Sequence, residues 1–378
     1  MVSSLIRQHE RYRFSGINLI ASENRMSPAA MQALSSDLAG RYGEAWYGGY
    51  RYAAEMVAEV EALARKVFRA EHAFVTPLSG HMCDLAALFS FTGHGDMVAA
   101  VPKEQGGYPL GYHKFGRRLL PLPMDDYAIE TEEACSLVAE RHPAMTMLGA
   151  STILFPHPVA ALRGAGHDVL LYDASHVLGL VAAGVFQQPL AEGADVMIGS
   201  THKSFPGPQG GIVLTDSDEK AVALAGMLEF SFEEGIGLVD NPHLHRIAAL
   251  GITLEEMRDR GAAYARQIVA NARALAAAMH DLGMPVRFAD RGFTESHQVL
   301  LSLPADEAEQ LCRRLERQHI FIDISGRIGV AEATHVGMEE DDMDTVAQLM
   351  AAASKGEQVR GDVVAFASRF YPDGAQAI

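Results

Sequence analysis

The segment ADVMIGSTHKSFPGPQGG (194–211) joins an apolar run to a turn rich in glycine and proline, and it places Lys203 just beyond that run. A second apolar run, DVLLYD (168–173), ends in Asp173. Short apolar runs bounded by turn residues are typical of buried strands. The sequence therefore predicts a lysine and a carboxylate at the ends of two buried strands.

A lysine and a carboxylate in these positions suit one particular cofactor. A lysine amine is unreactive while it is protonated at its usual pKa of about 10.4. Burial and cationic neighbours lower that pKa, and the neutral amine then forms a Schiff base. Pyridoxal phosphate needs such a lysine, together with a carboxylate that holds its protonated ring nitrogen. The competing interpretation is that Lys203 and Asp173 are solvated loop residues, as most charged side chains are.

Short apolar runs alternate with helical patterns between residues 55 and 215. The spacing of apolar residues predicts amphipathic helices over 55–68 and 82–91. Alternation of strands and helices, with strands apolar on both faces, predicts an α/β fold with a mostly parallel sheet covered by helices. A ligand is then expected at the carboxyl ends of the strands. The predicted strands are HAFVTP (72–77), DMVAAV (96–101), AMTMLGAS (144–151), DVLLYD (168–173), ADVMIGS (194–200) and GGIVLT (210–215).

The length of the chain, 378 residues, exceeds the roughly 250–300 residues at which a single hydrophobic core stops growing. The final third changes character, because a long helical pattern (252–283) is followed by a strand candidate (298–304) and another helix (306–318). We therefore expect an N-terminal segment over 1–50, a large domain over 51–251 and a smaller C-terminal domain over 252–378.

Composition and charge exclude several classes of protein. A net charge of −17 without a basic block disfavours binding to nucleic acid. No apolar stretch reaches the length of a membrane helix, and the N-terminus lacks the apolar core of a signal peptide. The three cysteines, Cys83, Cys135 and Cys312, are too scattered for a disulfide framework or a metal site. These features indicate a cytoplasmic protein that binds no metal and no membrane.

Five motifs, in their order along the chain, resemble the motif series of the serine hydroxymethyltransferase family. They are NLIASEN (18–24), LSGHMCDLAAL (78–88), YDASHVLGLVAAG (172–184), STHKSFPGPQGG (200–211) and SGRIGVAEATHVG (325–337). The resemblance covers roughly residues 14 to 350, and its first and fourth motifs are the most specific. It implies an aspartate aminotransferase-like fold (pyridoxal-phosphate fold type I) with a smaller C-terminal α+β domain.

The resemblance also implies roles around the cofactor. Lys203 matches the family's Schiff-base lysine, and His202 matches the histidine before it. Asp173 matches the aspartate paired with the ring nitrogen, and His176 matches a histidine beneath the ring. Further cofactor contacts are implied for Ser79, Gly80, His81, Ser151, Ser200 and Asn241. Of these, Ser79, Gly80 and His81 open a helix after a strand, where backbone N–H groups bind phosphate.

Substrate binding is implied for Arg327 and Ser22. Arg327 matches the arginine that binds the carboxylate of the amino-acid substrate, which a guanidinium holds by two parallel hydrogen bonds. Ser22 matches a residue beside that carboxylate. Tyr42 and Glu44 match a tyrosine and a glutamate that move protons at the substrate hydroxyl, and Tyr47 follows as an aromatic residue near the lysine. In the family this segment serves the neighbouring subunit, which implies a homodimer with shared active sites.

Three departures from the family pattern affect the expected function. The family's GGHLTHG, whose second histidine stacks on the cofactor ring, is GGYPLGY here (106–112), so Tyr108 is the first candidate for stacking and His113 the second. Asp240 and Asn241 replace a glycine pair that contacts phosphate in the family, and because an acid repels phosphate, either Asn241 alone contacts it or the loop has moved. The asparagine-rich loop that helps to bind the folate pterin has no counterpart in HIFIDISGRIG (319–329).

These observations leave three hypotheses about the reaction. The first is hydroxymethyl transfer, in which serine or a 2-methylserine-like amino acid is cleaved between Cα and Cβ and tetrahydrofolate carries the carbon. The second is folate-independent aldolase or threonine-type transaldolase chemistry, which the missing pterin loop favours. The third is transamination, racemisation or decarboxylation. All three make the chain a pyridoxal-phosphate enzyme, and the sequence leaves the use of folate open.

Overall fold

The computed structural model describes residues 1–43, 47–231, 233 and 235–371. The chain forms two compact units, which we call the large unit (Arg25–Ala262) and the small unit (Met1–Asn24 with Ala263–Ile378). The helix α10 (Leu244–Asp281) contributes residues to both. The division into domains expected from the sequence stays a prediction. Within the described ranges, no helix combines the length and the apolar character that crossing a membrane requires.

A seven-stranded sheet forms the centre of the large unit, with the order β2-β10-β9-β8-β7-β3-β4 among the described residues. β10 runs antiparallel to both of its neighbours, and the other pairings are parallel. The mostly parallel α/β sheet expected from the sequence is confirmed. Its strands are β2 (His72–Phe74), β3 (Met97–Ala100), β4 (Arg118–Pro121), β7 (Met145–Leu148), β8 (Val169–Asp173), β9 (Val196–Ser200) and β10 (Gly211–Thr215).

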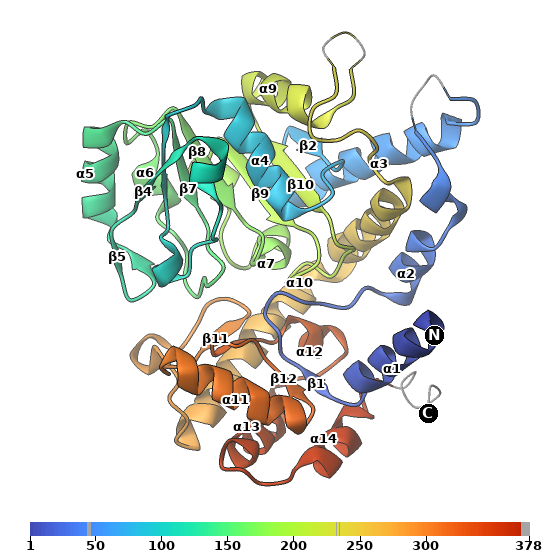
Figure 1. Cartoon of the computed structure of the whole chain (residues 1–378), viewed down its shortest axis with the longest axis vertical. Helices are drawn as coiled ribbons and strands as arrows, with labels where there is room; N and C mark the ends of the chain where they lie inside the picture. The colour runs from blue at the N-terminus through green and yellow to red at the C-terminus, as the bar shows by residue number, and fades with distance from the viewer. Residues whose placement is uncertain (44–46, 232, 234, 372–378) are drawn as a thin grey trace. The chain divides into compact units, whose positions relative to one another are not determined.

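Helices cover this sheet, as its apolar strands require. Every residue of β8, β9 and β10 is buried, which is expected for strands with both faces covered. Figure 1 shows α4 (Gly80–Phe91) lying across the sheet, where it packs on β9, β10 and α9 (Asp218–Leu228). Other helices of this unit are α2 (Pro28–Leu34), α3 (Arg51–Phe68), α5 (Thr131–Arg141), α6 (Val159–Leu162), α7 (Leu178–Ala182) and α8 (Pro189–Glu192), and a short hairpin pairs β5 (Met124–Asp125) with β6 (Ala128–Ile129).

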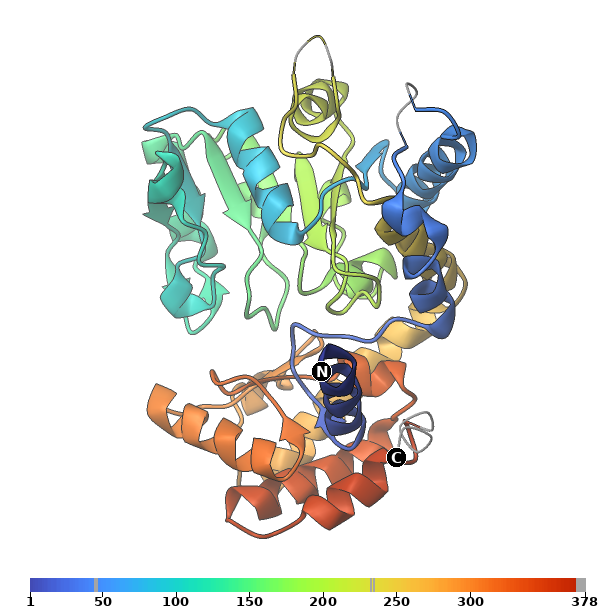
Figure 2. The same ribbon diagram turned by 45° about the vertical axis from the view of Figure 1, so that its right-hand side comes forward.

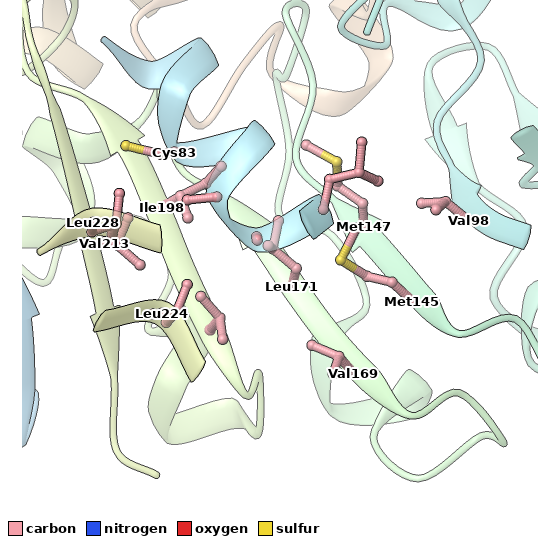
Figure 3. Close-up of a cluster of buried hydrophobic side chains, with 14 of the residues drawn as sticks. Cys83, Val98, Met145, Met147, Val169, Leu171, Ile198, Val213, Leu224 and Leu228 are labelled. Atoms are coloured by element: carbon pink, nitrogen blue, oxygen red, sulfur yellow. The ribbon is translucent and has the colours of Figure 1, made fainter. Parts of the chain in front are cut away.

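The hydrophobic core between α4 and the sheet identifies which side of each strand faces that helix. Leu171 of β8 and Ile198 of β9 belong to the same buried cluster as Cys83 of α4 (Figure 3). Side chains two residues apart on a strand point to the same face. Asp173 and Ser200, two residues beyond Leu171 and Ile198, therefore lie on the α4 face at the carboxyl ends of their strands.

The small unit combines short strand pairs with helices, as expected for an α+β domain. β1 (Ile17–Asn18) pairs in parallel with β12 (Ile320–Phe321), so the N-terminal segment is built into this unit. β11 (Gln298–Leu300) pairs antiparallel with β13 (Arg327–Gly329). Figure 2 shows α11 (Ala305–Arg317) beside α13 (Glu340–Ser354). Other α-helices in the described part of this unit are α1 (Val2–Phe14), α12 (Ala331–His335) and α14 (Arg360–Ala367), and a 3-10 helix covers Ala289–Arg291.

Candidate active site

Asp173 is the last residue of β8, and a backbone hydrogen bond holds its side chain. The residue is 8% exposed, and its Oδ1 accepts a hydrogen bond from the backbone N–H of Ser175 at 2.8 Å. The end of β7 approaches closely, because a Cβ at Gly149 would collide with the carbonyl oxygen of Asp173. Gly149 also has a φ of +94°, which favours glycine. The carboxylate is therefore held in one place at the carboxyl edge of the sheet.

A serine connects the segment after β8 to the end of β9. The Oγ of Ser175 accepts a hydrogen bond from the backbone N–H of Ser200 at 2.9 Å. Ser175, Ser200 and the adjacent His176 are all buried. The structure thus brings Asp173, His176 and Ser200 together, and it adds Ser175, which the sequence analysis did not single out.

Lys203 lies on a loop that is closed at its base by hydrogen bonds within the loop. The backbone N–H of Thr201 donates to the carbonyl of Gly210 at 3.1 Å, and that of Gly207 donates to the carbonyl of Thr201 at 2.9 Å. The hydroxyl of Thr201 donates to the carbonyl of Pro208 at 2.6 Å. His202 and Lys203 are partly buried. The glycines and prolines after Lys203 therefore shape a compact loop directly beyond β9.

The first turn of α4 rests on these same strand ends. The hydroxyl of Ser79 caps the helix by accepting a hydrogen bond from the backbone N–H of Met82 at 3.2 Å. A Cβ at Gly80 would collide with the Oγ of Ser200 and lie 3.2 Å from the Oγ of Ser175. Only glycine allows this approach. The positive end of the helix dipole, with its backbone N–H groups, then lies at the edge that carries Asp173, which is an arrangement suited to a phosphate.

His81 and Tyr108 form a pair beside the start of α4. The hydroxyl of Tyr108 lies 3.1 Å from Nδ1 of His81, and the two rings meet edge to face with their centroids 6.0 Å apart. Burial raises the pKa of Tyr108, and the negative charge of Asp173 raises it further. Tyr108 therefore remains a neutral phenol at physiological pH. His113, the second candidate for stacking, is exposed.

The other predicted residues of the large unit are more dispersed. Ser151 follows β7 and is partly buried. Asn241 precedes α10, and its buried Oδ1 has no hydrogen-bond partner among the described residues, whereas Asp240 is exposed. Tyr42 and Tyr47 are exposed, and their rings stack with centroids 4.8 Å apart. Glu44 lies outside the described residues.

Arg327 begins β13 in the small unit and is paired with an acid. Its Nε donates to Oδ2 of Asp323 at 2.8 Å, with side chains that are 12% and 21% exposed, respectively. The turn from β12 to β13 contains only residues 322–326. The segment with Ser22 lies beside β13, because the backbone N–H of Gly329 donates to the carbonyl of Leu19 at 2.9 Å. The small unit thus brings together the segments that carry Ser22 and Arg327.

Asp84, in the middle of α4, was missed by the sequence analysis. It is 4% exposed, and its Oδ1 has no hydrogen-bond partner within the described part of the chain. Burial raises the pKa of Asp84 well above its usual range, the charge of Asp173 raises it further, and that of Lys203 lowers it. The signal that could have found it is the isolation of a single acid in an otherwise apolar helix, MCDLAALFSF (82–91), since a helix that is apolar on all sides is buried.

Comparison with known proteins decides the family. The family model for serine hydroxymethyltransferase matches residues 1–350. The chain belongs to the serine hydroxymethyltransferase family. Proteins named serine hydroxymethyltransferase from Methanothermobacter thermautotrophicus and Pyrococcus furiosus are 38% and 36% identical to it, over 98% and 97% of this chain and 93% of each relative.

A solved structure gives the same fold. The L-threonine transaldolase from Pseudomonas fluorescens, in its internal aldimine state, matches with a TM-score of 0.89 at 27% identity, over 98% of this chain and 91% of that one. This member of the serine hydroxymethyltransferase family is thus a pyridoxal-phosphate enzyme of fold type I. Its chemistry is directed at the Cα–Cβ bond of a β-hydroxy amino acid.

The large unit of this family member contains groups that fit pyridoxal phosphate. The absence of a side chain at Gly80 lets the first turn of α4, with its backbone N–H groups, lie directly against Ser200 at the edge of the sheet, where these groups suit a phosphate. The buried carboxyl of Asp173 fits a protonated ring nitrogen, and the amine of Lys203 fits the aldehyde. When bound, the cofactor supplies an electron sink for the carbanion that forms at Cα.

Proposed function

We propose that this enzyme transfers a hydroxymethyl group, by cleaving or forming the Cα–Cβ bond of serine or a 2-methylserine-like amino acid with tetrahydrofolate as the carbon carrier. The observation that carries this proposal is the match of the serine hydroxymethyltransferase family over residues 1–350. The relatives of that name that are 36–38% identical support it further.

The cofactor roles are proposed from the geometry of the large unit together with the motifs. Lys203 binds the cofactor aldehyde, and Asp173 holds the ring nitrogen in its protonated state. The phosphate is bound at the first turn of α4. Contacts elsewhere on the cofactor are proposed for His81, Tyr108, Ser151, His176, Ser200, His202 and Asn241.

In the small unit, Arg327 is proposed to bind the carboxylate of the amino-acid substrate, with Ser22 beside it. A guanidinium binds a carboxylate through two parallel hydrogen bonds, which fixes the orientation as well as the position of the substrate. The bond from Nε of Arg327 to Asp323 supports this role, because it fixes the plane of the guanidinium. Orientation matters, since the Cα–Cβ bond has to stand perpendicular to the cofactor ring to be broken.

Glu44 is proposed as the group that takes the proton of the β-hydroxyl, with Tyr42 and Tyr47 near it. This role rests on the motif, and it implies that the segment acts in the active site of a second subunit. We therefore expect a homodimer, which analytical ultracentrifugation would test by measuring the mass of the particle in solution.

The second candidate function is a folate-independent aldolase or threonine-type transaldolase reaction. The short turn 322–326 favours it, because it leaves no room in the sequence for the family's pterin loop. The likeness to the L-threonine transaldolase of Pseudomonas fluorescens also favours it.

One incubation series tests these functions. The purified protein is supplied with pyridoxal phosphate and incubated with D- and L-serine, threonine and 2-methylserine, with and without tetrahydrofolate. Release of glycine or alanine that depends on tetrahydrofolate supports hydroxymethyl transfer. Release without it selects the second candidate, and formation of a keto acid or of the opposite enantiomer contradicts both. Lys203→Ala is the control, and it should lose both turnover and the visible absorbance of the bound cofactor.

A further inference from the structure

The side chain of Asp84 is an acid buried in an apolar layer. Its helix, α4, also buries Cys83, Ala86, Ala87 and Leu88. An ionised carboxylate without compensating hydrogen bonds is unstable in such surroundings. The Oδ1 of Asp84 has no hydrogen-bond partner among the residues that the structure describes. The packing of α4 thus favours the neutral acid.

The position of Asp84 on α4 directs it toward the strand ends. Residues four apart lie on the same face of a helix. Gly80, one turn before Asp84, is the point where α4 touches Ser175 and Ser200. Asp173 lies on the face of β8 that α4 covers. Asp84 and Asp173 are therefore two carboxyl groups in the same layer between helix and sheet.

Few other ionisable groups act on Asp84. Asp173 and the amine of Lys203 influence it directly. Burial is the main cause of the raised pKa values of Tyr108 and Tyr112, and the negative charge of Asp173 raises them further. Arg246 of α10 acts on the neighbouring Cys83 instead. Among the elements packed against α4, β9 and β10 contribute apolar or uncharged side chains, and α9 contributes Ala221, Leu224 and Leu228. The charged Lys220 of α9 lies 5.6 Å from the ring centroid of Phe91, at the far end of α4 from Gly80.

Asp84 and Asp173 differ in how well each can carry a charge. Asp173 accepts a backbone hydrogen bond from Ser175, which stabilises a carboxylate. Two carboxyl groups that share a site do not both ionise readily, so the proton remains on the one less able to carry a charge. Asp84, whose Oδ1 accepts no hydrogen bond among the described residues, is that group.

We propose that Asp84 is a positioning residue that holds a proton at neutral pH, so that Asp173 is the single negative charge facing the cofactor ring. The proposal takes the role of Asp173 from the proposed function. It assigns to α4, besides its role at the phosphate, control over the charge at the ring nitrogen.

Infrared difference spectroscopy of the full-length protein as purified tests this proposal. The C=O stretching band of protonated carboxylic acids should be stronger at pH 7 in the wild type than in Asp84→Asn, and the difference between the two spectra should be the band of one acid. Asp306→Asn, which removes an exposed carboxylate from α11, should lose only a carboxylate band. A carboxylate band lost in Asp84→Asn at pH 7, with the acid band unchanged, would overturn the proposal.

Titration of the same band tests the coupling between Asp84 and its neighbours. Removing the charge of Asp173, in Asp173→Asn, should move the midpoint of the Asp84 band to lower pH. Removing the charge of Lys203, in Lys203→Ala, should move it to higher pH. A midpoint that stays within about 0.3 pH units in both variants, roughly a twofold change in the proton equilibrium, would contradict the coupling.

Stability gives a second readout, for use if one variant folds poorly. The pKa of Asp84 is higher in the folded than in the unfolded protein, so its stabilising effect is complete below the unfolded pKa of about 4 and is lost as pH rises toward the folded pKa. Between these two pKa values, the factor by which the equilibrium constant of unfolding changes per pH unit should be up to ten times larger in the wild type than in Asp84→Asn. Equal slopes would overturn the proposal. Neither readout depends on turnover, so both remain informative if the proposed reaction is wrong.

Discussion

Arg327 and Asp323 form an ion pair across the tight turn before β13, with 2.8 Å between Nε of the arginine and Oδ2 of the aspartate. The second oxygen of Asp323 accepts a hydrogen bond from the backbone N–H of Ser325 at 3.0 Å. The backbone of the turn therefore holds the carboxylate of Asp323 in place, and this carboxylate orients the guanidinium of Arg327. Both side chains are largely covered, so this pair is screened less than a surface pair.

Replacing Asp323 by Asn should weaken the binding of the amino acid more than it slows the reaction. Losing a charged hydrogen bond leaves Arg327 less well oriented, and we expect KM for the amino acid to rise about tenfold, which corresponds to about 1.4 kcal/mol. Steady-state kinetics with Asp306→Asn as the exposed control would measure this. A KM equal to that of the wild type would show that Asp323 does not orient the arginine.

A side chain at Gly80 should displace the first turn of α4 from the strand ends. The Cβ of Gly80→Ala collides with the Oγ of Ser200, so the affinity for pyridoxal phosphate should fall by at least about tenfold. Gly226→Ala is the matched control, because Gly226 lies in α9 with nothing within 4 Å of its added Cβ. That control should stabilise the protein by about 0.5–1 kcal/mol. Equilibrium dialysis with the cofactor and thermal unfolding would measure both effects.

His157 should make stability depend on pH below neutrality. It is buried, its Nδ1 accepts a hydrogen bond from the backbone N–H of Gly149 at 3.1 Å, and burial lowers its pKa to about 4. The unfolded chain takes up a proton near pH 6.5, whereas the folded protein resists it until about pH 4. The stabilising effect is therefore complete above pH 6.5 and is lost as pH falls toward 4.

The variant that tests this is His157→Gln, which cannot titrate. The free energy of unfolding, measured with urea between pH 4.5 and 7, should change less with pH in the variant than in the wild type. The difference should be up to about 1.4 kcal/mol per pH unit, which corresponds to the uptake of one proton on unfolding. If the wild type and His157→Gln have parallel pH profiles, another group causes the pH dependence.

Glu44→Gln should slow cleavage of the Cα–Cβ bond without affecting cofactor binding. A general base contributes typically 10²–10⁴-fold, and we expect turnover to fall by about that factor. The visible absorbance of the loaded protein should stay the same, since the variant leaves Lys203 and Asp173 intact. Glu59→Gln, an exposed substitution in α3, is the control, and wild-type turnover in Glu44→Gln would exclude Glu44 as the base.

The sequence predicts the buried elements of this fold better than its edges. β8 and β9 were predicted because they are apolar on both faces, which follows from their central place in a parallel sheet. β4 was missed, because an edge strand that exposes Arg118 and Leu119 and ends at Pro121 lacks that pattern. The predicted helix over 252–283 begins earlier, at Leu244, and its first residues Leu244, Ile247, Ala249 and Leu250 are buried within the large unit.

The residues of the candidate site could also be predicted only in part. The family motifs named Lys203, Asp173 and Arg327, but the contacts that hold these residues depend on distances in space. Asp323 lies four residues before Arg327 and outside the motif 325–337, so the motif did not indicate its contact with the arginine. Asp84 was missed because an amphipathic helix, as expected over 82–91, would turn its one acid toward the solvent.

The loop that carries Lys203 is closed by bonds between its own residues, from Thr201 to Gly210. Its backbone is therefore preorganised before any cofactor arrives. Emptying the enzyme and reloading it should require no refolding of this segment, and amide hydrogen exchange within it should be equally slow in both states. Because the backbone around Lys203 already has its final conformation, we expect the rate of reloading to depend on the entry of pyridoxal phosphate and not on a rearrangement of this loop.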